Sequence, residues 1–225
     1  MRQYSFRSIR DIENFGRVRL SKSFYMRDFL HSEISQYEAI PNLPSDPDLA
    51  ILAGRRLCDE LLEPLQDSFG RIAVRSAYRS ATINEIGHRK GYGCASNRRN
   101  FARHIWDVRD ENGAFGAMAC IVIPWFADRY AAGEDWRALA WWIHDHLPYS
   151  ELCFYPHFCA FNIAWHELPK RVIRSYITPK GMLTGFDTHN STGLHEGWYQ
   201  HWGEKYLQPV ASDGLSSPFD TPNTR

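Results

Sequence analysis

The segment from Ile72 to Asp110 decides how the chain is interpreted; it begins IAVRSAYRSATIN and closes on RHIWDVRD. The apolar run Ile72–Val74 predicts a short buried strand, because such runs bounded by polar residues are typical of strands in a sheet interior. The strand leads into a polar turn that carries Arg75, Tyr78 and Arg79. Since guanidinium groups bind carboxylates through paired hydrogen bonds, this turn is a candidate site for an anionic ligand.

The second half of the segment adds candidate metal ligands. His104 precedes a second predicted strand, Ile105–Val108, and two carboxylates follow at Asp107 and Asp110. Imidazole and carboxylate groups are the usual zinc ligands beside cysteine. Arginines and a His/Asp cluster that meet at strand ends predict a site for an anionic substrate over a metal ion.

Composition limits the function classes. A chain of 225 residues with 44% apolar content can bury one sizeable core. Lys+Arg and Asp+Glu balance at 26 each, which argues against a general nucleic-acid or acidic-membrane partner. The sequence has no apolar run long enough to span a bilayer and its start lacks the apolar region of a secretory signal, so we expect a soluble, cytoplasmic protein. The five cysteines are an odd number and are expected to be free thiols.

Periodicity outlines the elements. Leucines at helical spacing predict a helix from Pro47 to Phe69, with Gly70 as its C-cap. A second amphipathic helix is expected from Trp136 to His146, whereas Ala117–Ile123 is either a buried strand or a helix. Three further strands are predicted at Glu151–Tyr155, Ala160–Trp165 and Val172–Ile177.

These elements give a single main domain. Residues 1–19 read as an irregular lead-in, residues 20–209 as the domain, with an aromatic C-terminal extension from about residue 180, and residues 210–225 as a flexible tail.

Three stretches resemble the zinc D-Ala-D-Ala carboxypeptidase-like family, which has the Hedgehog/DD-peptidase fold. They are LSKSFYMRDFLHS, the long run from IPNLPSDPD to YRSATIN, and LPYSELCFYP, and the resemblance spans Leu20 to Ile177. It implies an α+β domain with a central, mostly antiparallel sheet and flanking helices. The family's S-G-Y-R-S segment falls on the chain's S-A-Y-R-S, so that Arg79 matches the arginine that helps to hold the substrate, with Tyr78 beside it.

The family's metal motif is altered in this chain. When S-x-H-x-x-G-x-A-x-D is laid on the sequence, Asp107 takes the aspartate position, whereas Asn100 and Asn162 take the two histidine positions. An amide supplies neither the anionic nor the imidazole donor that zinc prefers. Histidines lie nearby: His104 is three residues before Asp107, and His166 is four after Asn162, on the same face of a strand.

The first hypothesis is therefore a zinc hydrolase with a displaced ligand set of His104, Asp107 and His166, with Asp110 as the alternative carboxylate. A zinc-bound water would attack a peptide bond next to a free carboxylate held by Arg79, as in the peptidoglycan D-Ala peptides that are the family's usual substrates. Glu151 and Glu167 are the nearest candidate bases, although neither aligns cleanly.

The second hypothesis is a metal-free descendant that binds a peptide or cell-wall fragment, or that serves as a structural part of an assembly such as a phage particle. Asn100 and Asn162 favour it, and the lack of a secretion signal fits a phage-encoded or cytoplasmic protein. Hydrolysis of a non-peptide amide is a third hypothesis that the sequence does not separate from the first. For Arg79 and His104 taken alone, an ion pair at a strand end and a satisfied buried histidine are the ordinary alternatives.

Overall fold

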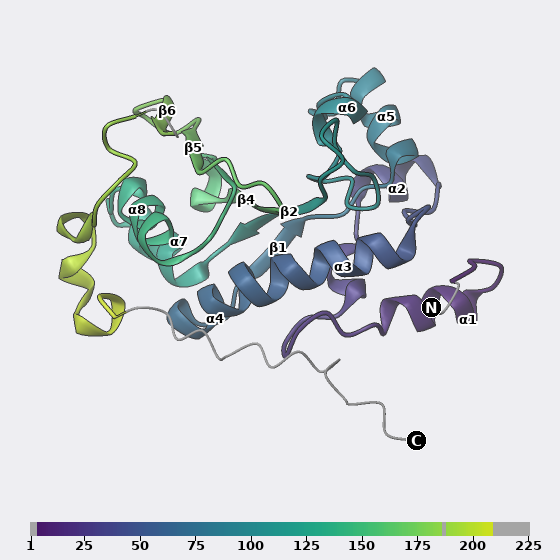
Figure 1. Cartoon of the computed structure of the whole chain (residues 1–225), viewed down its shortest axis with the longest axis horizontal. Coiled ribbons are helices and arrows are strands. Elements are labelled where there is room, and N and C mark those ends of the chain that lie inside the picture. The colour runs from purple at the N-terminus through teal and green to yellow at the C-terminus, as the bar shows by residue number, and fades with distance from the viewer. Residues whose placement is uncertain (1–3, 186–187, 209–225) are drawn as a thin grey trace.

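A computed structural model describes residues 4–185 and 188–208. It has an α+β architecture, with one six-stranded mixed sheet in the order β1-β2-β4-β3-β5-β6 and helices around it (Figure 1). The strands are β1 (Ala73–Ser76), β2 (Gly116–Val122), β3 (Glu151–Phe154), β4 (Phe161–His166), β5 (Val172–Ser175) and β6 (Gly181–Thr184). Only the β3–β5 pair is parallel among these strands, so the prediction of a mostly antiparallel sheet with flanking helices is confirmed.

The helices account for about half of the remaining described residues. They are α1 (Ile9–Gly16), η1 (Met26–Phe29), α2 (Glu33–Glu38), α3 (Pro47–Leu57), η2 (Cys58–Leu62), α4 (Glu63–Phe69), α5 (Ala81–Arg89), α6 (Asn97–Asn100), α7 (Pro124–Ala131), α8 (Trp136–His146), η3 (His157–Cys159), η4 (Glu196–Trp198), η5 (Gln200–Trp202) and η6 (Glu204–Tyr206). No helix within residues 4–185 and 188–208 combines the length and apolar character needed to cross a membrane.

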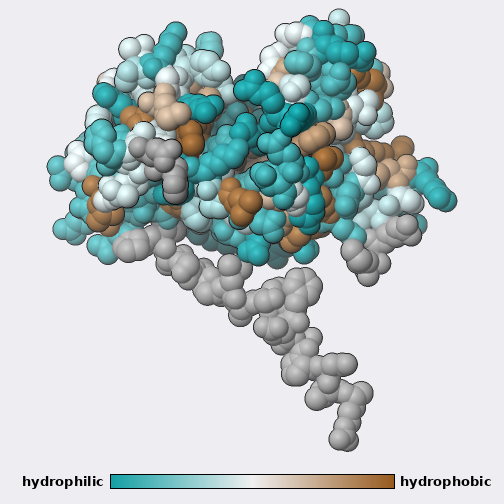
Figure 2. Space-filling view, turned by 45° about the horizontal axis from the view of Figure 1, so that its top comes forward, coloured by the Kyte–Doolittle hydropathy of each residue, from teal (hydrophilic) through white to brown (hydrophobic). Residues whose placement is uncertain are grey.

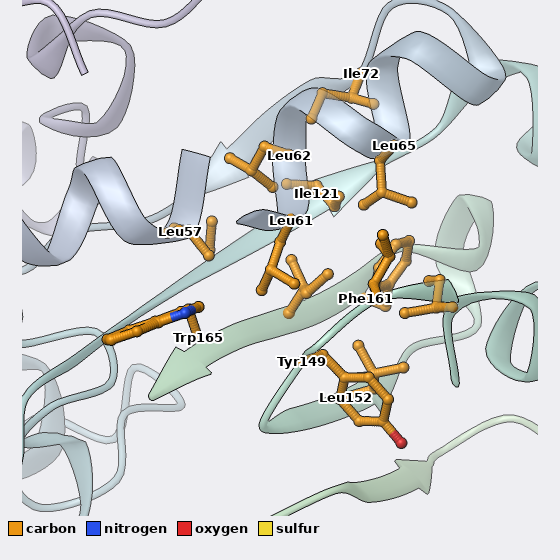
Figure 3. Packing of buried hydrophobic residues seen from close by; sticks show 14 of the residues in the cluster. Leu57, Leu61, Leu62, Leu65, Ile72, Ile121, Tyr149, Leu152, Phe161 and Trp165 are labelled. Carbon is orange, nitrogen blue, oxygen red and sulfur yellow. The ribbon is translucent and has the colours of Figure 1, made fainter. Parts of the chain in front are cut away.

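The predicted helix from Pro47 to Phe69 is confirmed as the continuous run α3–η2–α4, with one π-helical turn at η2. Asp46 caps its start by accepting a hydrogen bond from the Leu49 N–H at 3.0 Å, and Gly70 follows its end with a φ of +80°. Its leucine side chains pack against one face of the sheet (Figure 3). This layer forms the core and leaves the opposite face of the central strands available for a site.

Strand alternation separates a core face from a polar face. In β4, Phe161 and Ile163 are fully buried in the core, whereas Asn162 between them is half-buried on the other side. The segment predicted as either strand or helix is strand β2, which lies between β1 and β4. Its Ala117, Ala119 and Ile121 side chains join the same core, which continues to α8.

The predicted strand Ile105–Val108 is wrong. The segment forms turns with one isolated bridge, Phe101 to Ile105, because Ala102 has a φ of +55° that interrupts extended backbone. It lies against the start of β2, where the Met118 N–H donates to the Arg103 carbonyl at 3.0 Å. Gly116 permits this approach, since a Cβ there would lie 2.5 Å from the Ala102 carbonyl oxygen.

Two segments near the ends of the described residues contain more regular structure than the sequence indicates. The predicted irregular lead-in contains α1, which is capped by Ser8 and buries Phe15. The aromatic extension begins with β6, an edge strand, and continues as η4–η6 packed beside α8. The predicted flexible tail, residues 210–225, lies outside the described residues.

Candidate functional site

The strand register places one row of side chains across the polar face of all six strands. From β1 to β6, the row consists of Ser76, Cys120, Asn162, Cys153, Arg174 and Met182. All six residues line a cavity of ≈ 840 Å³, the larger of two adjoining cavities here. Because neighbouring strands lie about 4.8 Å apart, the row is roughly 24 Å long.

Two walls rise beside this row. One comes from the turn after β1 and from the segment around α6, and it supplies Arg79, Asn100, Arg103 and His104. The other consists of residues that follow β5 and open β6, including Tyr176 and Lys180. Figure 2 shows this face of the molecule hollowed between the two lobes that carry α5–α6 and β5–β6. The cavity is therefore a long open cleft with a floor of sheet side chains.

Arg79 lies at the β1 end of the cleft with part of its guanidinium unpaired. Its Nη1 donates to the Cys94 Sγ at 2.6 Å, and its backbone N–H donates to the His104 carbonyl at 2.8 Å. Its Nε is buried, with no partner among residues 4–185 and 188–208, and no carboxylate within this range pairs with the side chain. Among the described residues, the strand-end ion pair named as the ordinary alternative for Arg79 is therefore not formed.

His104 lines the cleft as a neutral acceptor. Its Nδ1 lies 2.7 Å from the Ala77 carbonyl oxygen, which only accepts, so Nδ1 carries the proton. Burial, followed by the nearby positive charges of Arg79 and Arg103, lowers the pKa of His104 to about 3. The ring is uncharged at neutral pH, and its Nε2 can only accept a hydrogen bond.

Asp107 points away from the cleft. Its Oδ2 accepts from the Ser45 backbone N–H at 2.7 Å and from the Ser45 Oγ at 3.1 Å, and its Oδ1 accepts from the Tyr78 hydroxyl at 3.1 Å. Tyr78 is fully buried, and burial with the Asp107 charge raises the pKa of its phenol. Neither residue lines the cleft. The structure thus places Tyr78 away from the cleft, and the Asp107–Tyr78 pair joins the turn after β1 to the N-terminus of α3.

His166 shares the polar face with Asn162, as predicted, but it lies at the other end of β4. Its Nε2 is 3.3 Å from the Asp110 Oδ2, and its Nδ1 accepts from the Leu168 N–H at 3.0 Å. The Asp110 Oδ1 also accepts hydrogen bonds from the backbone N–H groups of Asn112 and Ala114, and such bonds are typical of an aspartate that stabilises a turn. His166 and Asp110 therefore contact each other outside the cleft and do not line it.

The predicted zinc ligands are consequently not brought together. His104, Asp107 and His166 have separate partners, because the 101–108 turns direct Asp107 toward Ser45 and β4 carries His166 beyond the cleft. Within the described ranges, no group of three or more His, Cys, Asp or Glu side chains could hold a metal ion. The donor set does not fit zinc, whether Asp107 or Asp110 is taken as the carboxylate.

Both asparagines at the family's histidine positions do line the cleft. The Asn100 Nδ2 donates to the Asn84 Oδ1 at 2.8 Å, and the Asn162 Nδ2 donates to the Tyr155 hydroxyl at 3.0 Å. Of the two candidate bases, Glu151 lines the cleft, where it pairs with Arg103 and with Lys170 at 3.6 Å. Glu167 lies outside, 3.8 Å from Arg109.

Sequence analysis missed the two thiols of the floor and Arg174. Burial raises the pKa of Cys120 to about 11 and also raises that of Cys153, so both are protonated at neutral pH and are poor nucleophiles. The alternation of Cys153 with buried neighbours in β3 was a signal for this face, but only the strand order places these residues beside Asn162.

Comparison with known proteins gives no further assignment: no family model, no curated protein and no solved structure matches the chain.

Proposed function

We propose that this chain binds a peptide through its free carboxylate in the cleft, without a metal ion. The observation that carries the proposal is the Arg79 guanidinium, which lies at one end of the cleft with a buried, unpaired Nε and no carboxylate partner in the described chain. Since Nη1 donates to Cys94 and the Nε is buried, the donors left to a carboxylate are the remaining N–H groups at the end of the guanidinium. The neutral His104 beside it offers an acceptor for a ligand N–H.

The arrangement of the cleft supports descent from a Hedgehog/DD-peptidase-like site. Arg79 matches the family's substrate-holding arginine, while Asn100 and Asn162 match its two histidine ligands, and all three line one cleft. These positions are far apart in the sequence, so their convergence supports the resemblance. We propose on this basis a D-Ala-terminated peptide or cell-wall fragment as ligand, in a phage-associated or cytoplasmic setting.

The zinc-hydrolase hypothesis is less well supported. It needs three protein donors around one metal position, and the side chains of His104, Asp107 and His166 are held by separate partners. The hypothesis stays a prediction, and measurements of metal content and cleavage test it.

Calorimetric titration tests the binding proposal. The ligands are N-acetyl-Lys-D-Ala-D-Ala with a free C-terminal carboxylate and the same peptide as its amide. We expect the parent protein to bind the acid at least tenfold more tightly than the amide, since one charge-assisted pair is worth about 1.5–3 kcal/mol.

Two variants that each remove one positive charge test whether Arg79 makes the contact with the peptide carboxylate. Arg79→Gln is expected to abolish the preference for the acid, whereas Arg89→Gln, on the exposed side of α5 and outside the cleft, should keep it. Equal affinity of the parent for acid and amide, or an unchanged preference in Arg79→Gln, would refute the proposal.

A further inference from the structure

The cleft is strongly positive in a chain whose charges balance. Its lining contains the cations Arg79, Arg103, Arg174 and Lys180 but only one carboxylate, Glu151. Lys+Arg and Asp+Glu are equal at 26 each over the whole sequence. Charge of one sign in a concave, partly desolvated surface focuses the electrostatic field and attracts ligands of the opposite sign. The cleft thus favours a ligand with more than one negative charge.

The positive charges divide into two groups. Arg103 is neutralised by its ion pair with Glu151 near the middle of the cleft. Arg79 lies at the β1 end, whereas Arg174 on β5 and Lys180 in the turn before β6 lie toward the opposite end. Neither Arg174 nor Lys180 makes a side-chain hydrogen bond or ion pair with the part of the chain described, so both cations are available to an external anion.

The strand register sets the separation of the two groups. Cys120 pairs with Asn162, Asn162 with Cys153, and Cys153 with Arg174, which makes three strand-to-strand steps. At about 4.8 Å per step, Arg174 lies roughly 14 Å from Cys120. Arg79 follows β1, whose Ser76 lies one further step outside Cys120, so the β1 end of the cleft is roughly 19 Å from Arg174. An extended peptide advances about 3.3 Å per residue, so about six residues cover this span.

An aromatic surface lies beside the same route. Tyr155 and Tyr176 follow Cys153 and Arg174 by two residues each and therefore continue the cleft-facing side of β3 and β5. Their rings stack with centroids 5.5 Å apart and an interplanar angle of 15°, and Tyr176 is 59% exposed. The exposed Tyr176 ring, supported by the half-buried Tyr155 ring, offers apolar contact to the body of a ligand whose ends are charged.

We infer that Arg174 and Lys180 form a second anion subsite, and that the ligand is an acidic peptide. Its C-terminal carboxylate binds Arg79, and a carboxylate side chain about six residues earlier binds Arg174 and Lys180. This inference rests on the proposed function, because Arg79 sets the position of the peptide's C-terminus.

A set of acetylated octapeptides with free C-termini tests the subsite by calorimetry. The peptides differ only in carrying Glu or Gln at the position about six residues before the last. The parent protein is expected to bind the Glu peptide about tenfold more tightly than the Gln peptide, and the Arg174→Gln/Lys180→Gln double variant should bind the two equally. That double variant should still prefer the free acid of either peptide to its amide, because Arg79 is intact.

A matched control separates the subsite from the general field of the protein. Arg89→Gln/Arg98→Gln removes the same two charges from residues outside the cleft and should keep the preference for Glu. If the parent binds both peptides with equal affinity, the second subsite is refuted while the proposed function stands. If the parent binds neither peptide, nor the D-Ala peptide, the proposed function is refuted, and the subsite with it.

Discussion

The backbone N–H of Arg79 donates a hydrogen bond to the carbonyl oxygen of His104 at 2.8 Å. The His104 ring returns to the same turn, where its Nδ1 donates to the Ala77 carbonyl at 2.7 Å. These two bonds fix the turn after β1 against a segment 25 residues further along the chain. The position of the turn that carries Arg79 therefore depends on the orientation of His104.

The burial of His104 predicts a loss of stability in mild acid. The pKa of His104 is about 3 in the folded protein and about 6.5 in the unfolded chain, so below pH 6.5 the unfolded state binds the additional proton. The free energy of unfolding should fall as the pH falls, by about 2 kcal/mol between pH 7 and pH 5 for this residue. Urea unfolding at both pH values measures the loss, which should be smaller by that amount in His104→Gln. An equal loss in both proteins would contradict the assignment.

Asp107 is expected to stabilise the fold and not to bind a ligand. Asp107→Ala leaves the Ser45 and Tyr78 donors without their acceptor, and should lower the free energy of unfolding by about 3 kcal/mol. Tyr78→Phe removes one hydrogen bond and should lower it by about 1 kcal/mol. Denaturant unfolding measures both, and an Asp107→Ala protein of parental stability would show that this network has no structural role.

Modification of Cys94 should block the carboxylate site. The Sγ accepts from the Arg79 Nη1, so an added carboxamidomethyl group would displace the guanidinium. Iodoacetamide treatment is expected to lower the affinity for the peptide acid about tenfold, which calorimetry measures. Cys94→Ser is the control: its hydroxyl can accept from Arg79, so binding should persist and should resist the reagent. A similar loss in treated Cys94→Ser would trace the effect to another thiol.

Asp145 is expected to hold the C-terminal extension in place. Its buried carboxylate accepts from the His195 backbone N–H and the Tyr199 hydroxyl, each at 2.7 Å, and lies 2.7 Å from the His195 Nδ1. Asp145→Ala should destabilise the protein by about 3 kcal/mol and expose residues 188–207 to proteolysis, as followed by mass spectrometry. His201→Ala, which removes an exposed pair with Glu134, should change neither property. Equal protection of the segment in Asp145→Ala would contradict this role.

Local pattern was sufficient to predict several of the elements. Leucine spacing gave the helix from Pro47 to Phe69, and apolar alternation located β3 and β4, because each pattern reflects burial of one face. The predicted strand at Ile105–Val108 failed because a single left-handed residue, Ala102, redirects the backbone. That turn also reverses the expected direction of Asp107.

The candidate site was only partly predictable. Arg79 and the pair Asn100 and Asn162 were identified from the motif, and the structure places all three in the cleft. Cys153 and Arg174 line the cleft because the strands are in the order β2-β4-β3-β5. This order is set by pairing between strands that are distant in the sequence, so no local sequence pattern predicts it. For the same reason, the expected meeting of His166 with His104 failed, although His166 does share a face with Asn162.

The most direct test of metal-free binding is titration of the peptide acid into protein dialysed against EDTA, repeated after addition of one equivalent of zinc. We predict the same affinity in both titrations, with intact peptide recovered by chromatography after prolonged incubation. Binding that appears only with zinc, or release of a C-terminal residue when zinc is present, would contradict the account and restore the zinc-hydrolase hypothesis.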